Sequence, residues 1–95
     1  MLIEIKTLNI ENNGYKRSIS LDKMYVNSNS VVSIVDYEGA SDFLLREQSK
    51  FYGEKFSLLK VNEGGTINSV IVLGTADQLF SKFNSVSSGK TILNG

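Results

Sequence analysis

The pair Asn13-Gly14 is the sequence feature that most restricts the fold. It lies between two runs in which apolar and polar residues alternate. A tight turn between paired strands needs positive φ values, which Asn and Gly tolerate best. The segment therefore predicts a β-hairpin. With Asn13 and Gly14 as the two loop residues, Leu8 faces Ile19 across the ladder.

The apolar positions change phase along the first strand of this hairpin, from Ile3 and Ile5 to Leu8 and Ile10. A strand becomes apolar on both faces through a bulge, or because its two ends have different partners. We expect one face of the hairpin to cover the domain's own core and the other to meet a second copy or a partner subunit. Ile3 and Ile5 are therefore predicted interface residues.

Further strands are predicted after the first hairpin. Enrichment in Val, Ile and Tyr indicates strands at residues 24–26 and 31–37. A second hairpin is expected to turn at Glu63-Gly64-Gly65. Its last strand ends in a continuous apolar run, residues 70–73, which predicts that this strand is covered on both faces.

A C-terminal helix is predicted from Thr75 onward. Thr75 and Gln78 have the spacing of a capping box, and Leu79, Phe80 and Phe83 are expected to form one buried apolar stripe. Residues 42–51 are read either as a short helix capped by Ser41 or as a long ordered loop.

The predicted fold class is therefore mainly β, of the α+β kind. It is a small antiparallel sheet of about five strands built from hairpins, with a C-terminal helix. The length of 95 residues suits one domain, placed at residues 1–86. Residues 87–95 lack periodicity and predict a flexible tail. Its apolar residues Ile92 and Leu93 have no evident place in the core and are candidate interface residues.

Composition argues against several classes of function. The chain has no Cys and no His, which removes thiolate chemistry and the commonest general base and metal ligand. Ten basic residues balance ten acidic ones, so no net charge draws the chain to nucleic acid or to an anionic membrane. No apolar run approaches the length of a membrane span. We expect a non-enzymatic protein with no cofactor and no metal.

Two short motifs suggest a ligand and are read as polar loops instead. Gly89-Lys90-Thr91 has the end of a phosphate-binding loop, but Asn84 stands where that loop needs its first Gly. Asp36, Glu38 and Asp42 offer oxygen ligands for Ca²⁺ or Mg²⁺, without the spacing of a calcium-binding loop.

Basic and aromatic residues alternate at two places, as in sites that stack bases and follow phosphates. These weak nucleic-acid candidates are Tyr15, Lys16 and Arg17 beside the first turn, and Lys50, Tyr52 and Lys55 before the second hairpin. The zero net charge argues against this function.

Exposed sheet edges are the most positive feature of the sequence. A sheet of about five strands leaves free edges that pair with other chains. The chain contains no Pro that would block such pairing.

One pattern resembles a known family. "MYVNSNSVVSIVD" followed by "GGTINSVIVLGTADQLFSKF" resembles the small flagellar FlbD/SwrD-type proteins and similar short phage-encoded proteins. Val26-Asn27 and residues 75–83 carry the likeness, which covers about half the chain. The chain differs by its Asn-Gly hairpin, by residues 39–55 and by its tail. The resemblance implies a small sheet plus helix that serves a larger assembly, and it assigns no catalytic or binding residue.

We therefore expect a structural or interaction protein that self-associates or docks as an accessory subunit of a larger assembly, such as a phage virion. The alternative is a small regulatory or counter-defence protein that binds a nucleotide or nucleic acid. The expected location is the cytoplasm, or a particle assembled there.

Overall fold

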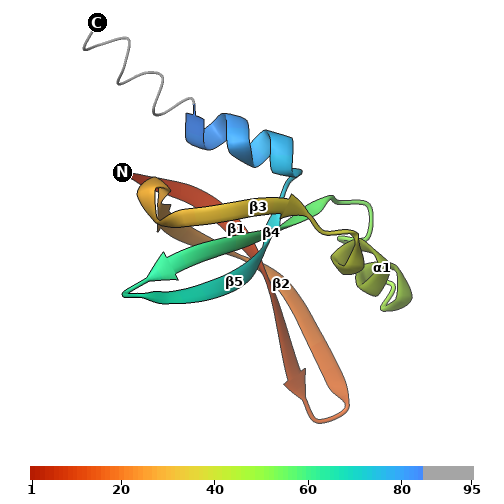
Figure 1. Ribbon diagram of the computed structural model, residues 1–95. Helices are drawn as coiled ribbons and strands as arrows, with labels where there is room; N and C mark the ends of the chain where they lie inside the picture. Colours follow the sequence, from red (N-terminus) through yellow and green to blue (C-terminus); the bar gives the residue numbers. More distant parts are fainter. Residues whose placement is uncertain (85–95) are drawn as a thin grey trace, which may run out of the picture.

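The computed structural model describes residues 1–84, in which five strands, two helices and one 3₁₀ turn follow one another (Figure 1). The elements are β1 (Leu2–Asn13), β2 (Lys16–Asn27), the 3₁₀ turn η1 (Ser28–Ser30), β3 (Val31–Asp36), α1 (Glu38–Arg46), β4 (Phe56–Glu63), β5 (Thr66–Leu73) and a C-terminal helix over residues 76–84. The predicted fold class is confirmed.

All five strands belong to one antiparallel sheet in the order β2-β1-β5-β4-β3. The β4–β5 hairpin turns at Gly64-Gly65, as expected. β1 and β5 are in register at Thr7 and Val72. Beyond that point the tip of the β1–β2 hairpin projects away from the other strands (Figure 1). The two edges of the sheet are therefore β2 and β3.

The two apolar phases of β1 face two different cores. The β1–β2 register runs without a shift from Leu2–Asn27 to Asn13–Lys16, so no bulge is needed. Ile3 and Ile5 lie in one core, beneath the C-terminal helix. Leu8, with Ile19 and Leu21 of β2, packs on the opposite face against the core that α1 covers.

The assignment of Ile3 and Ile5 to an interface is therefore wrong. Their side chains are 4% and 2% exposed, and they pack against residues of the same chain. A helix covers each face of the sheet at a different end, so the apolar side chains of both phases pack within one protomer. Lysine at these two positions would oppose folding rather than association.

The first hairpin turns one residue later than predicted. Asn13 pairs with Lys16, so the loop is Gly14-Tyr15. Leu8 consequently faces Leu21 instead of Ile19. Gly14 has a φ of 64°, and Tyr15 is not among the residues with positive φ. A positive φ at only the first central residue is typical of a type II′ turn. Such a turn favours Gly at the first central position and accepts other residues at the second.

The C-terminal helix begins at the predicted capping box. The Thr75 N–H donates to Gln78 Oε1 at 2.9 Å, and the Gln78 N–H donates to Thr75 Oγ1 at 3.1 Å. Leu79 and Phe83, one helical turn apart, enter the core. Phe80 is 61% exposed, so its predicted burial is wrong. Successive helical residues lie about 100° apart, so Phe80 turns away from the face that carries Leu79.

The segment between β3 and β4 contains a helix that begins earlier than predicted. α1 runs from Glu38 to Arg46. Ser41 is not its cap, because its hydroxyl donates instead to the Glu54 carbonyl at 3.0 Å. Leu44 is fully buried against the sheet. The helix ends before the predicted limit, and turns connect it to β4.

Several predictions concern the last part of the chain. The predicted flexible tail at residues 87–95 lies outside the described residues, as do the predicted interface residues Ile92 and Leu93 and the Gly89-Lys90-Thr91 motif.

Within residues 1–84, neither helix has the length and apolar character needed to cross a membrane.

Candidate interaction site

The free edge of β3 offers unpaired backbone groups to another chain. The Tyr37 N–H donates to the Phe56 carbonyl at 2.9 Å, which shows that the backbone N–H and C=O groups of Tyr37 are directed toward β4. Successive residues of a strand point their backbone groups in opposite directions. The backbone groups of Val35, two residues before Tyr37, are therefore also directed toward β4. Ile34 and Asp36 then direct their N–H and C=O groups away from the sheet.

A bulge shortens this edge. The β3–β4 register shifts between Val31 and Ser33. Bulges of this kind limit how far an added strand can continue the ladder. The side chains around the edge must therefore supply much of any contact that forms here.

An apolar groove runs beside the edge, between β3 and the C-terminal helix. It has a volume of about 390 Å³ and is lined by Val31, Val32, Ser33, Ile34, Ala76, Asp77 and Phe80. Val32 is 57% exposed, and Phe80 is 61% exposed. In Figure 1 the C-terminal helix lies along β3, so the groove and the edge form one surface. We call this surface the β3 edge site.

The β3 edge site carries little free charge. Asp36 is the one charged residue of β3, and its Oδ1 accepts a hydrogen bond from the Ala76 N–H at 2.8 Å. This contact places the carboxylate at the N-terminus of the C-terminal helix, where the helix dipole favours negative charge. Asp77 on the helix is the other acidic residue in the lining.

The opposite edge of the sheet is polar by comparison. β2 carries Lys16, Arg17, Asp22 and Lys23. Lys23 Nζ lies 3.6 Å from Glu4 Oε1, and the Tyr25 hydroxyl donates to the same oxygen at 3.2 Å. The hydrogen bond to Glu4, followed by the negative charge of its carboxylate, raises the pKa of Tyr25 above its ordinary value. Charges along an edge discourage pairing with another strand.

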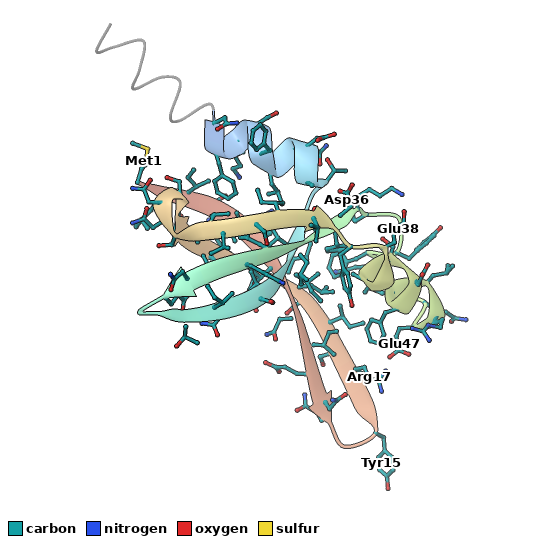
Figure 2. All side chains as sticks on the ribbon, viewed as in Figure 1. Met1, Tyr15, Arg17, Asp36, Glu38 and Glu47 are labelled. Carbon is teal, nitrogen blue, oxygen red and sulfur yellow. The ribbon has the colours of Figure 1, made fainter. Side chains whose placement is uncertain are left out.

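The first group of basic and aromatic residues lies at the hairpin tip, where it borders a polar cleft of about 550 Å³. Tyr15 is fully exposed, and Figure 2 shows it pointing away from the body of the protein. Arg17 pairs with Glu47 at the end of α1 (Figure 2). A phosphate group would have to compete with that carboxylate for the guanidinium. Its guanidinium also lies 5.7 Å from the centre of the Phe43 ring. Arg17 therefore fastens the hairpin to α1.

The second group is spread along the segment between α1 and β4. Lys50 lies over the Phe51 ring at 5.2 Å, and Tyr52 is exposed. Lys55 lines a small pocket with Asp36 and Glu38, at the start of α1. Arg17 meets the other end of α1, so Lys55 and Arg17 lie at opposite ends of this helix, and each has acidic residues beside it.

The acidic residues of the segment 36–42 have separate surroundings. Asp36 is engaged by the C-terminal helix, as described above. Among residues 1–84, no three His, Cys, Asp or Glu side chains come together in a way that could hold a metal ion.

Sequence reasoning foresaw free edges but did not identify the β3 edge site. One signal was present: Leu79 and Phe80 are adjacent in the helix, so their side chains point about 100° apart around its axis. Val31 and Val32 are adjacent as well, and the β3–β4 register shifts between Val31 and Ser33. The groove itself depends on how helix and strand meet, which the pattern of each segment does not contain.

Comparisons with protein-family models, with curated proteins and with solved structures found no match. The resemblance to the small flagellar proteins therefore stays a prediction.

Proposed function

We propose that this protein is a non-enzymatic interaction module that binds another polypeptide through the β3 edge site. The observation that carries the proposal is the joint exposure of Val32 and Phe80 beside a strand edge whose backbone groups at Ile34 point outward. An extended segment of a partner can continue the sheet there and place apolar side chains in the groove.

The energetics require a partner that covers more than these two side chains. Complete burial of one large apolar side chain contributes about 1.5–3 kcal/mol, and Val32 and Phe80 are already partly buried. Association costs roughly 4–15 kcal/mol in lost translational and rotational freedom. The partner must therefore also bond to the backbone edge and lie against the C-terminal helix.

This function agrees with an accessory subunit of a larger assembly. A small domain whose Phe80 and Val32 are uncovered gains stability when an assembly covers them. The particle expected from the sequence, a phage virion, stays a prediction.

Site-specific photo-crosslinking tests the proposal. A photoreactive benzoylphenylalanine is placed at Val32 in the protein expressed in its native cells. A matched protein carries the probe at Ile67, which is 50% exposed and lies on β5 away from the site. We expect a discrete crosslinked polypeptide from position 32 and none from position 67. The proposal fails if position 32 gives no adduct, or if both positions give the same adducts.

A further inference from the structure

We infer that the polypeptide that occupies the β3 edge site is a second copy of this chain, bound by antiparallel pairing of β3 with β3. The inference rests on the proposed function, since it names the partner of the same site. A two-fold symmetric pairing places the same strand on both sides of the axis, so a suitable edge must complement itself.

Charge is the first reason to choose β3. In a symmetric pair, every charged residue near the axis meets a residue of its own edge. β3 has no charged residue from Val31 to Val35, and Asp36 is already engaged by the Ala76 N–H. The β2 edge carries four charged residues, Lys16, Arg17, Asp22 and Lys23, and charges along an edge discourage pairing with another strand.

The pattern of side chains is the second reason, and it selects one register. With the axis at Ser33, Val32 faces Ile34 of the other copy, and Val31 faces Val35. Asp36 then lies opposite the end of the η1 turn, at Ser30, which is uncharged. An axis at Ile34 would instead place the Asp36 carboxylate opposite the apolar Val32. Pairing at Ser33 matches apolar with apolar residues along the shortened edge.

The direction of the backbone groups agrees with this register. Ser33, two residues before Val35, directs its N–H and C=O groups toward β4, so the Ser33–Ser33 pair at the axis is a non-hydrogen-bonded pair. Ile34, with outward groups, then bonds to the second copy. The C-terminal helix and Phe80 lie beside β3 in each copy, so the grooves of the two copies adjoin across the axis.

Sedimentation equilibrium of the purified protein tests the partner. We expect the wild-type protein to dimerise reversibly. Val32→Lys and Phe80→Lys should each weaken the dimer about tenfold or more, because burial of an unpaired charge is costly. Ile67→Lys, a change at another apolar residue that is at least half exposed, on β5, should leave the dimer unchanged. Thermal melts check that all variants fold.

A single cysteine tests the register. The chain has no Cys, so Ser33→Cys introduces the only thiol. Non-hydrogen-bonded partners lie about 4.5 Å apart between Cα atoms, within the range that a disulfide spans. We expect mild oxidation to join Ser33→Cys protomers into covalent dimers, and Ile67→Cys protomers to remain separate.

Two results would show that the partner is not a second copy. One is a wild-type protein that stays monomeric, and the other is a dimer that is weakened by Ile67→Lys and not by Val32→Lys. A dimer that depends on Val32 but yields no disulfide at position 33 would overturn the register. The proposed function fails separately, by the absence of any crosslink at position 32 in cells. A crosslink there to a different polypeptide, with a monomeric purified protein, would keep the function and reject the second copy.

Discussion

Adjacent residues of the C-terminal helix have opposite roles. Leu79 is 4% exposed and packs in the core with Ile3, Ile5 and Val72, whereas Phe80 lies at the surface. The larger residue of the pair therefore contributes less to folding. Side-chain size alone would have ranked them in the reverse order.

Substitution of Leu79 and of Phe80 should separate these roles. Leu79→Ala leaves a cavity in the core and should lower the free energy of unfolding by about 2–5 kcal/mol. Phe80→Ala removes a surface side chain and should change it by about 0.5 kcal/mol or less. Urea denaturation followed by circular dichroism measures both. Equal losses, or a larger loss for Phe80→Ala, would contradict the packing described.

The Tyr25–Glu4 hydrogen bond predicts a shifted titration. The Glu4 carboxylate accepts from the Tyr25 hydroxyl and so raises the pKa of Tyr25 above 10.0. The folded protein prefers the neutral phenol, so this contribution to stability is present below pH 10.0 and is lost as the pH rises through the raised pKa.

Replacement of Glu4 should remove that shift. In Glu4→Ala we expect the pKa of Tyr25 to return toward 10.0, because both the acceptor and the negative charge are gone. NMR titration of ¹³C-labelled tyrosine follows the ring directly. Glu11→Ala, at another acidic residue of β1, should have no such effect. An unchanged Tyr25 titration in Glu4→Ala would show that the hydrogen bond does not form in solution.

At the scale of elements, the first hairpin depends on its turn. The turn places Gly14 at a φ of 64°, a conformation that residues with a side chain rarely adopt. Apart from its chain neighbours, no heavy atom lies within 4 Å of a Cβ added at Gly14, so backbone strain is the main cost of a substitution there.

Gly14→Ala should therefore destabilise the protein by about 1–2 kcal/mol. Gly53→Ala is the matched control, since Gly53 also has open space around it and does not have a positive φ. We expect Gly53→Ala to match the wild-type thermal melt. A Gly14→Ala protein with the wild-type melting temperature would mean that the hairpin tip adapts to a different turn.

The elements themselves were largely predictable from sequence, because turn residues and periodicity act locally. Gly64-Gly65 and the Thr75–Gln78 capping box mark their elements correctly. The loop at Gly14-Tyr15 was misplaced by one residue, since Asn13-Gly14 and Gly14-Tyr15 both place a Gly in the turn. The roles of Ile3 and Leu8 were not predictable, because they depend on which helix covers which face of the sheet.

At the scale of the whole molecule, two helices cover opposite faces of one sheet at different ends. Cores on both faces allow a short chain to use the apolar residues of both phases of β1. The same arrangement leaves β3 at an edge, with the C-terminal helix beside it and Phe80 uncovered. The candidate site is thus a consequence of topology, which explains why no local motif marks it.

The exchange rate of the Ile34 amide reports whether the β3 edge pairs with β3 of a second copy. Ile34 points its N–H away from β4, whereas Val35 points its N–H toward β4 and serves as an internal control. We predict that hydrogen exchange at Ile34, followed by NMR, slows as the protein concentration rises, while Val35 stays protected throughout. In Val32→Lys, exchange at Ile34 should stay fast at every concentration. Exchange at Ile34 that is fast and independent of concentration in the wild-type protein would contradict this pairing.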